Sequence, residues 1–372
     1  MKIAFVVHDY HQSGGHSRYV TELARRFGRD HEVHVFANTI HENSPNGIQF
    51  HRVRAWRRTA LTTILTFVGP ATRMLNGSFD IIHAQGLSCL RANVLTAHIC
   101  NRAWFLARQK QGSTVALKEK VFESLVSPLE SKLYRSKSKP WIIATSERVR
   151  RDLADCYGRR DRTEVIYHGV DTELFHPRNR ELHRTRVRQA LGLGQSDFAF
   201  LFVGDLRKGA GLVIDALTRA PNAKLVLVSR TPVDAYRRQA EETGVADRVH
   251  FHGPTDAIQE YYGAADAFVF PTPYDAFGMV ISEAMATGLP VITSREAGAA
   301  ELIQDQQSGL LMSNPSDTQQ LAQLMLRLMS DPALCKSLGN AARGRMVSQT
   351  WDRVAEQTMN VYQRVMAERA CC

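Results

Sequence analysis

The sequence predicts two α/β domains in tandem, each a doubly wound, Rossmann-like parallel sheet flanked by helices. Its 372 residues suit two cores better than one, because a single domain usually holds about 100 to 200 residues. Short β-branched runs alternate with amphipathic stretches, which is the pattern of parallel strands joined by crossover helices. The alternation stops near residue 167 and begins again at residue 198.

The strands are predicted from these short apolar runs. In the first half they are residues 3–7, 32–37, 81–84, 94–97, 141–145 and 165–167. In the second half they are residues 198–203, 224–228, 249–251, 267–270 and 291–293, with helical stretches such as 211–219 and 233–242 between them. Residues 167–177 have turn residues at both ends and little periodicity, so they are interpreted as a hinge.

The expected boundaries are a first domain of residues 1–168, a second of residues 169–350, and a C-terminal helix in residues 351–372. Val354, Val361 and Val365 give this last segment a helical spacing with one buried side, so we expect it to cross back onto the first domain. Ligands of open α/β sheets bind beyond the carboxyl ends of the strands, which predicts a site in a cleft between the domains.

Composition excludes several classes of protein. With 44% hydrophobic and 23% charged residues, the chain is expected to be a soluble globular protein. Its six cysteines lack the spacing of a metal site or a disulfide framework, which favours a reducing cytoplasm. Residues 2–7 lack the pattern of a secretory signal, and the apolar stretch 60–74 is too short and interrupted to cross a membrane. The ending Cys371-Cys372 is not a CaaX motif and is interpreted as a disordered tail.

Positive charge is concentrated in the first half. Residues 1–165 hold 26 lysines and arginines against 14 acidic residues, whereas the remainder holds 21 against 23. A basic domain attracts polyanions, either nucleic acid or an anionic membrane. Residues 51–58 and 102–110 mix cations with aromatic residues, as interfacial segments do. Our hypothesis is peripheral docking on the inner face of the plasma membrane, and an ordinary solvated basic face is the alternative.

Two features of the first domain follow predicted strands. Gly14 and Gly15 lie between the first strand and a helix, where they allow a ligand to approach the backbone and the helical N–H groups. They form neither a GxGxxG fingerprint nor a P-loop, and an ordinary tight turn is the alternative. His98 follows strand 94–97, where an imidazole can hydrogen-bond a sugar hydroxyl or assist proton transfer. A hydrogen-bonded structural histidine or an exposed one is the alternative.

Two segments of the second domain also follow predicted strands. Arg207 and Lys208 follow strand 198–203, where two cations can neutralise a diphosphate. Asp275 precedes a helix that begins at Met279, whose first N–H groups can face a phosphate or sugar oxygen. Glu283 lies four residues after Met279 on the same helical face and can accept two bonds from a ribose diol, while Asp275 can reach the sugar. A solvated loop and a solvated helix face are the alternatives.

Together these segments resemble the GT-B glycosyltransferases of family 4, a retaining group that includes lipopolysaccharide core glucosyltransferases and phosphatidylinositol mannosyltransferases. The resemblance covers nearly the whole chain and depends on the order of its motifs. These are Gly14-Gly15, residues 165–171, Val203-Gly204 with Arg207-Lys208-Gly209, residues 275–283, 288–292 and 308–311, and Trp351.

The resemblance implies roles for individual residues. The catalytic residues would be His98, Arg207, Lys208 and Asp275. The donor-binding residues would be Gly14, Gly15, Pro254, Ala276, Phe277, Gly278, Met279, Val280 and Glu283. Arg207 and Lys208 would clamp the diphosphate, Glu283 would hold the ribose, and the segment ending at Pro254 would hold the base. No metal and no other cofactor is expected.

The implied activity is retaining transfer of a hexose from a nucleotide-sugar, with UDP-sugar expected, to a glycan, lipopolysaccharide or lipid-linked acceptor held by the first domain. A transferase with a soluble small-molecule acceptor and a nucleotide-sugar epimerase of the same fold are the alternatives. A phosphorylase is disfavoured by the short chain. Nucleic-acid binding is disfavoured because no recognition motif accompanies the charge.

The chain departs from the family pattern at four places. Asp275 stands where Glu is usual, which affects the expected sugar contact, and Asp205 stands where Arg is frequent. Residues 229–232, Ser-Arg-Thr-Pro, replace a glycine-rich turn, and His168 replaces a common Asn.

Overall fold

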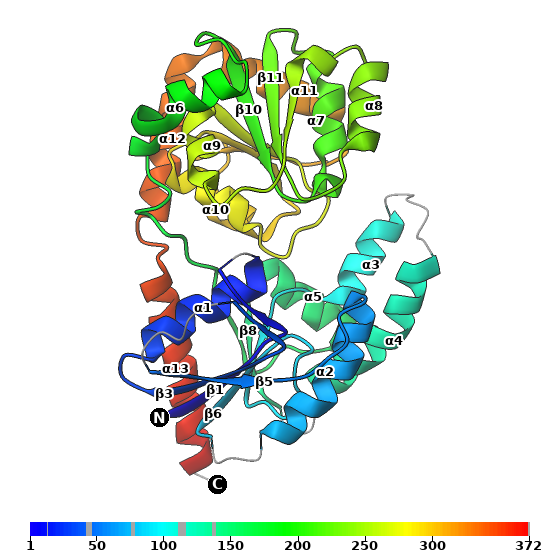
Figure 1. Ribbon diagram of the computed structural model, residues 1–372, viewed down its shortest axis with the longest axis vertical. Coiled ribbons are helices and arrows are strands. Elements are labelled where there is room, and N and C mark those ends of the chain that lie inside the picture. Colours follow the sequence, from blue (N-terminus) through cyan, green and yellow to red (C-terminus); the bar gives the residue numbers. More distant parts are fainter. Residues whose placement is uncertain (13, 42–46, 76–78, 111–116, 136–138, 371–372) are drawn as a thin grey trace. The chain divides into compact units, whose positions relative to one another are not determined.

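The chain folds into two compact units, shown in Figure 1. The computed structural model describes residues 1–12, 14–41, 47–75, 79–110, 117–135 and 139–370. Unit 1 comprises Met1–Gly169 and Trp351–Cys372, and unit 2 comprises Val170–Thr350.

Unit 1 is built on a parallel seven-stranded sheet with the order β5-β3-β1-β6-β7-β8-β9. The central strand β1 pairs with β3 on one side and β6 on the other. The strands are β1 Lys2–Val6, β3 Glu32–Ala37, β5 Ile48–Arg52, β6 Ile81–Gln85, β7 Val94–Ala97, β8 Trp141–Ala144 and β9 Thr163–Val165, and a small separate pair is β2 Asp9–Tyr10 with β4 Thr39–Ile40. Most residues of β1, β6, β7 and β8 are buried, as expected of a sheet covered on both faces.

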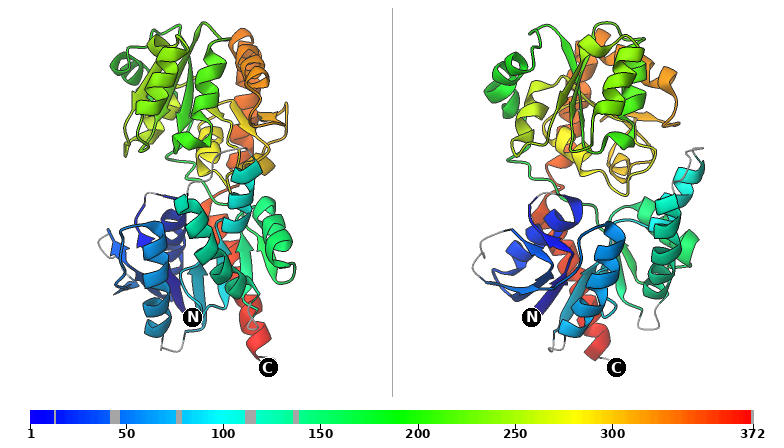
Figure 2. Two further views of the ribbon diagram at one scale, coloured as in Figure 1. Left: turned by 90° about the vertical axis from the view of Figure 1, so that its right-hand side faces the viewer. Right: turned by 45° about the vertical axis from the view of Figure 1, so that its right-hand side comes forward.

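Helices cover both faces of this sheet (Figures 1 and 2). They are α1 Gly15–Phe27, α2 Ala60–Met74, α3 Asn101–Lys110, α4 Leu117–Tyr134, α5 Glu147–Tyr157 and α13 Trp351–Ala370. The last helix returns to unit 1 and packs beside α1, with Trp351, Val354, Val361, Tyr362 and Val365 buried. Tyr362 also hydrogen-bonds the buried His83 of β6, with 2.6 Å between the hydroxyl and Nδ1.

Unit 2 repeats the architecture with a parallel six-stranded sheet of order β12-β11-β10-β13-β14-β15. Its strands are β10 Phe198–Val203, β11 Ala223–Val228, β12 Val249–His252, β13 Ala267–Phe270, β14 Val291–Ser294 and β15 Leu310–Met312. Its helices are α6 Arg178–Ala190, α7 Ala210–Leu217, α8 Asp234–Glu242, α9 Ile258–Ala264, α10 Met279–Ala286, α11 Thr318–Ser330 and α12 Pro332–Met346, with 3-10 turns η1 Leu206–Lys208, η2 Ala246–Arg248 and η3 Gly298–Leu302.

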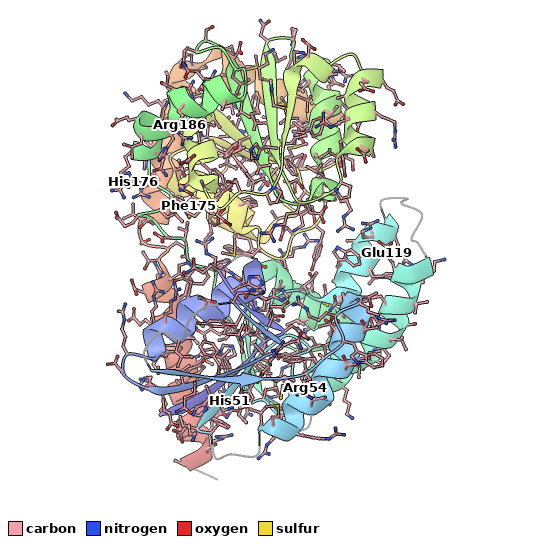
Figure 3. All side chains as sticks on the ribbon, viewed as in Figure 1. His51, Arg54, Glu119, Phe175, His176 and Arg186 are labelled. Carbon is pink, nitrogen blue, oxygen red and sulfur yellow. The ribbon has the colours of Figure 1, made fainter. Side chains whose placement is uncertain are left out.

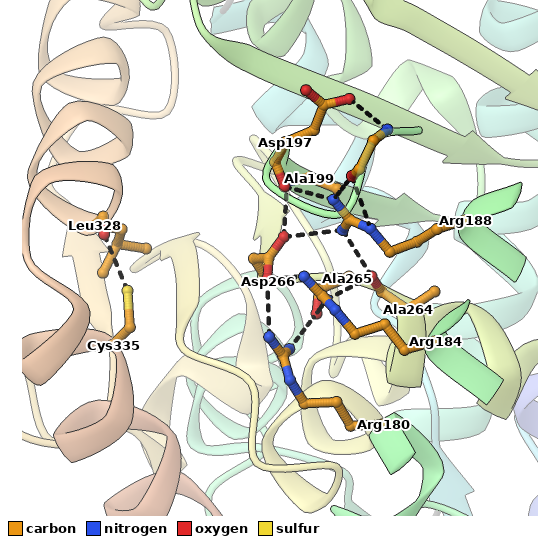
Figure 4. Close-up of polar contacts among 11 residues, drawn as sticks. Arg180, Arg184, Arg188, Asp197, Ala199, Ala264, Ala265, Asp266, Leu328 and Cys335 are labelled. Carbon is orange, nitrogen blue, oxygen red and sulfur yellow. Dashed lines mark hydrogen bonds and ion pairs between the residues drawn. The ribbon is translucent and has the colours of Figure 1, made fainter. Parts of the chain in front are cut away.

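An arginine stripe fixes α6 to the amino end of this sheet (Figure 4). Arg180, Arg184 and Arg188 are spaced four residues apart and therefore share one helical face. All three bind the carboxylate of Asp266, at 3.0, 2.8 and 3.1 Å respectively. They also donate to the carbonyls of Ala264 or Ala265 at the carboxyl end of α9, where cations are favoured by the helix dipole. This end of unit 2 is therefore held by a network of paired charges in which Arg188 is fully buried and Arg180 is half exposed.

The prediction of two parallel α/β sheets is confirmed, and the differences lie at sheet edges. The sequence reading missed the edge strands β5 and β15 and the small pair β2–β4, which are short or mix buried with exposed residues. The strand expected at residues 165–167 is wrong in position, since β9 ends at Val165. The reason is that β9 pairs only with β8, which itself ends at Ala144.

Candidate functional site

Unit 1 contains a cavity of about 590 Å³ at the carboxyl ends of its central strands. Gln85 ends β6 and His98 follows β7, and both line this cavity. Gly14 and Gly15, at the start of α1, lie on its wall. The structure therefore brings together the three residues that the sequence analysis selected in the first domain. We call this space the His98 cavity.

His98 is buried, with 6% of its surface exposed. Its Nε2 lies 2.8 Å from Oε1 of Gln85, and because an amide oxygen only accepts, Nε2 carries the hydrogen and Nδ1 is left as an acceptor. The ring stacks on His16, with centroids 4.2 Å apart, and meets Tyr19 edge to face. Burial, followed by the charges of His16, His168 and His83, holds the pKa of His98 well below its usual value. His98 is thus a neutral imidazole with a defined tautomer.

His168 adjoins His98 and is also neutral. The two ring centroids are 5.4 Å apart, and His168 is 3% exposed. Burial, together with the charges of His16 and Arg18, lowers the pKa of His168 to about 3. Tyr19 and Trp351 also contact its ring, so this residue connects the cavity wall to α1 and α13.

A buried carboxylate forms another part of the wall. Glu130 of α4 is 2% exposed and lines the His98 cavity. Its Oε1 accepts from the side-chain amide of Asn101 at 2.7 Å, and its Oε2 accepts from the Tyr157 hydroxyl at 2.6 Å. Burial raises the pKa of Glu130 despite these hydrogen bonds. The three residues join α3, α4 and α5 beside His98.

In unit 2 the predicted cations lie on η1, directly after β10. The Arg207 guanidinium is held by Asp205, with its Nε 3.0 Å from each carboxylate oxygen. Burial acts to raise the pKa of Asp205, but the hydrogen bonds and charge of Arg207 outweigh it, and the net effect is a lowered pKa. Asp205, which replaces the family's frequent arginine, therefore orients the neighbouring Arg207.

Lys208 and Asp275 are brought together. The Lys208 Nζ lies 2.6 Å from Asp275 Oδ2, although the two residues follow different strands. Gly209 allows this approach, because a Cβ at that position would lie 2.7 Å from the Pro271 carbonyl oxygen, and its φ of 110° favours glycine. The interaction joins the turn after β10 to the loop after β13.

The loop that contains Asp275 leads directly into α10. The Phe277 amide donates to Asp275 Oδ1 at 3.2 Å, and Ala276 and Phe277 are buried. Gly278 ends the loop with φ 90°, which places Met279 at the first position of α10. Met279 and Val280 are partly exposed, whereas Ile281 to Ala286 are buried. The first turn of α10 is thus partly exposed, and the rest of the helix is buried in unit 2.

Glu283 is buried, with 7% exposure, so the alternative of a solvated helix face is wrong. Its Oε2 accepts a hydrogen bond of 3.0 Å from the Tyr262 hydroxyl of α9. Tyr262 is fully buried and meets Phe175 edge to face, with centroids 5.5 Å apart. Figure 3 labels Phe175 beside the first residues of α6. A carboxylate buried on an apolar helix is stabilised by such a partner.

The Ser-Arg-Thr-Pro segment after β11 has a structural role. The Thr231 amide donates to Ser229 Oγ at 2.9 Å, and the Leu206 amide donates to Thr231 Oγ1 at 3.3 Å. The Thr231 hydroxyl also lies 3.3 Å from Asp205 Oδ1. A hydroxyl-supported turn thus replaces the expected glycine-rich turn and supports η1. Pro254 lies exposed in the loop after β12.

Sequence reasoning missed several residues that the structure places beside the predicted ones. Gln85 and His16 carried a usable signal, since one ends a central strand and the other follows the Gly14-Gly15 turn. Glu130 and Tyr262 gave none, because they lie inside helices and reach their partners only through tertiary packing.

Within the part of the chain that the structure describes, no cluster of His, Cys, Asp or Glu has the size and closeness needed to hold a metal ion. Among the same residues, no helix combines the length and apolar character needed to span a membrane.

Two family models match the chain, one in each half. A model of glycosyltransferase family 4 matches residues 13–174, and a model of glycosyl transferases group 1 matches residues 183–345. Together they cover most of both units.

Curated relatives agree with these matches. An uncharacterised glycosyltransferase of Methanocaldococcus jannaschii is 26% identical over 390 residues, which cover 98% of this chain and 99% of that protein. The D-inositol 3-phosphate glycosyltransferase of Acidothermus cellulolyticus is 33% identical over 254 residues, which cover 61% of this chain and 55% of that protein. The match with this second relative therefore spans only about half of its length.

Solved structures show the same fold. The structure of WaaG, a glycosyltransferase involved in lipopolysaccharide biosynthesis, superimposes with a TM-score of 0.81 at 21% identity, covering 97% of this chain and 99% of that chain. The Anabaena protein HepE in complex with UDP-glucose gives a TM-score of 0.72 at 20% identity, covering 100% of this chain and 99% of that chain.

Proposed function

Because the chain belongs to the GT-B glycosyltransferases of family 4, we propose that it is a retaining enzyme that transfers a hexose from a UDP-sugar to a lipopolysaccharide-type or lipid-linked acceptor. Above all, the 2.6 Å contact between Lys208 and Asp275 at the entry to α10 supports this function. It places a cation suited to a diphosphate beside a carboxylate suited to sugar hydroxyls.

Unit 2 would bind the donor. Lys208 and the oriented Arg207 would contact the diphosphate, and the first turn of α10 would add N–H groups and the positive end of its dipole. Glu283, held by Tyr262, would accept from the ribose hydroxyls. The loop ending at Pro254 would contact the base. The bound UDP-glucose in HepE supports a UDP-sugar as the donor.

Unit 1 would bind the acceptor in the His98 cavity. Its volume of about 590 Å³ fits a sugar-sized group. The Nδ1 acceptor of neutral His98 would receive a hydrogen bond from a hydroxyl. The involvement of WaaG in lipopolysaccharide biosynthesis supports a lipopolysaccharide acceptor, while the D-inositol 3-phosphate glycosyltransferase relative favours a soluble phosphorylated acceptor as the second candidate.

The proposed chemistry proceeds on one face of the sugar. The bond between the anomeric carbon and the leaving phosphate oxygen breaks, and the acceptor oxygen forms its bond from the same side, so the configuration is retained. The departing phosphate takes the acceptor's proton. Lys208 and Arg207 offset the negative charge that develops on the UDP, which is the task a metal performs in other transferases. We therefore propose transfer without a metal.

Docking on an anionic membrane is part of the same proposal. Figures 1 and 2 show α2, α3 and α4 on one side of unit 1. Exposed apolar residues on these helices are Leu65, Met74, Leu106, Val121 and Leu125. Trp56, 72% exposed, follows β5 on the segment that carries Arg54, labelled in Figure 3. Exposed apolar groups beside cations suit the boundary between headgroups and acyl chains.

The direct test measures UDP release from a panel of UDP-hexoses with and without lipopolysaccharide and lipid-linked acceptors. We expect acceptor-dependent UDP release and a product of retained anomeric configuration, both lost in Lys208→Ala. An epimerised free sugar nucleotide without acceptor product would show the epimerase instead. Vesicle flotation tests membrane docking separately, and the proposal predicts salt-sensitive binding to anionic vesicles that Trp56→Ser weakens.

A further inference from the structure

A second cavity in unit 1 lies at the amino ends of the strands, whereas His98 lies at their carboxyl ends. It measures about 600 Å³ and is formed where β6, β7, β8 and β9 begin and where α13 ends. Ile82, Val365 and Trp141 give it an apolar wall. Its size is typical of small-molecule sites, and the function proposed above does not use it. We call it the amino-end cavity.

Its lining carries an excess of positive charge. Among the residues that the structure describes, Arg91, Lys139, Arg162 and Arg369 line the cavity together with one acidic residue, Glu368. They come from the segments before β7, β8 and β9 and from α13, so only the fold brings them together. A concave surface lined by one sign of charge attracts ligands of the opposite sign.

Two of these cations, Lys139 and Arg162, form exposed ion pairs that a bound anion can replace. Lys139 Nζ lies 3.2 Å from Asp161, and Arg162 NH2 lies 3.2 Å from Glu368, with the four side chains between 39% and 58% exposed. Exposed ion pairs of this kind contribute little to stability. An anion with several oxygens can therefore compete for the guanidinium and ammonium groups.

Backbone strain coincides with the same two cations. Among the described residues other than glycine, only Lys139, Arg162 and Gln306 have positive φ, at 41°, 48° and 66°. Two of the three line this cavity, and Arg162 NH1 donates to the Lys139 carbonyl at 3.1 Å. Left-handed backbone is unfavourable for lysine and arginine, and retained strain is frequent at ligand sites.

A rigid aromatic surface completes the site. The Trp141 Nε1 donates to Glu368 Oε1 at 3.2 Å, while Glu368 Oε2 pairs with Arg162, so one carboxylate orients both groups. We propose that the amino-end cavity binds a phosphate monoester carried on an apolar or aromatic body. The phosphate would contact Arg91, Lys139, Arg162 and Arg369, and the body would pack against Trp141 and Ile82.

The test uses the full-length protein and three probes, namely inorganic phosphate, phenyl phosphate and dihexanoyl phosphatidic acid. Binding is measured by calorimetry and by the change in tryptophan fluorescence. We expect the two phosphates with an apolar body to bind at least about tenfold more tightly than inorganic phosphate, because only they reach Trp141. Tighter phenyl phosphate binding would indicate a soluble ligand, and tighter phosphatidic acid binding would indicate a lipid headgroup.

Arg162→Gly separates binding from folding. Glycine tolerates φ 48°, so this variant should match or exceed the parent in melting temperature while its affinity for the preferred probe falls at least about tenfold. Arg91→Gln should also weaken binding, and UDP release from the donor should be unchanged in both. The neighbouring exposed residue Arg160 does not line the cavity and supplies the control Arg160→Gly. Equal affinity in Arg162→Gly and Arg160→Gly, or no binding below roughly 1 mM by any probe, would overturn the proposal.

Discussion

The two predicted half-sites use opposite electrostatic strategies. Beside the His98 cavity of unit 1, the imidazoles of His98 and His168 are buried, and burial holds their pKa values below the usual value, while the ion pair of Arg57 with Asp9 lines another part of the cavity. In unit 2, the groups at the strand ends are charged and paired, Lys208 with Asp275 and Arg207 with Asp205. Burial disfavours the charged form of a titratable group, whereas an ion pair favours it.

This difference fits the proposed division of labour. A UDP-sugar has a diphosphate that needs positive charge, which Lys208 and Arg207 would supply. An acceptor hydroxyl needs only hydrogen bonds, which neutral imidazole supplies in a defined direction. Acid should therefore act mainly on unit 1, and substitutions that remove charge should act mainly on unit 2.

Acidification should have the largest effect. Burial lowers the pKa of His83 and His168 to about 3, compared with 6.5 when unfolded. As pH falls below about 6.5, the unfolded chain binds protons that the folded unit does not, so folding stability falls continuously toward pH 3. Each such histidine costs on the order of 4 kcal/mol over that interval. Thermal melts between pH 7.5 and 4 measure this loss.

His168→Asn tests the origin of the acid sensitivity. The family commonly has Asn at this position, so the variant should fold and should lose part of the pH dependence of its melting temperature. His41, which is exposed, supplies the control His41→Asn, whose melts should follow the parent at every pH. A parent melting temperature that is constant from pH 7.5 to 4 would contradict the neutral, buried state of these histidines.

Lys208→Ala should have the next largest effect. Removing a group that stabilises charge on a leaving phosphate typically lowers kcat by roughly 100- to 1,000-fold. The same change leaves Asp275 without its cation, which should further weaken donor binding. Steady-state kinetics with the best UDP-hexose measure the loss. Lys336→Ala, an exposed lysine on α12, is the matched control. Unaltered kcat/KM in Lys208→Ala would remove Lys208 from the proposed diphosphate site.

The contrast between the units also explains what the sequence could predict. The positions of His98, Lys208 and Asp275 could be predicted because each follows a strand that its run of apolar residues identifies in the sequence. The carboxyl ends of parallel strands then lie together at one end of a sheet. The Lys208–Asp275 contact was not predictable, because it depends on how closely Gly209 approaches Pro271.

Interaction partners that lie within helices could not be predicted from the sequence for the same reason. Tyr262 reaches Glu283 from a different helix, and Glu130 enters the His98 cavity wall from α4, so neither has a periodic or motif signal. The Asp205–Arg207 pair is local, yet its importance appears only once the hydroxyl-supported turn at Thr231 is seen beside it. Sequence pattern thus located the strand ends, and tertiary packing determined their partners.

Tyr262→Phe should have an intermediate effect. It removes the hydrogen bond to Glu283 Oε2 and leaves a buried carboxylate less satisfied, which costs about 1 to 3 kcal/mol. We expect donor KM to rise about tenfold with a smaller change in kcat, because Glu283 would bind the ribose and not the reacting atoms. Saturable UDP-sugar binding should be lost in Glu283→Ala. A kcat effect larger than the KM effect in Tyr262→Phe would argue against a ribose role.

Asp275→Glu should have the smallest effect and the most specific one. The added methylene restores the residue usual in the family but lengthens a side chain whose carboxylate already lies 2.6 Å from Lys208, so the carboxylate must shift. We expect kcat/KM to change only severalfold and the ratio between UDP-hexoses to change with it. Asp234→Glu, exposed on α8, is the control. If both rate and donor preference stayed the same, Asp275 would serve only as the counter-ion of Lys208, and the charge pairing of unit 2 would be structural at this position.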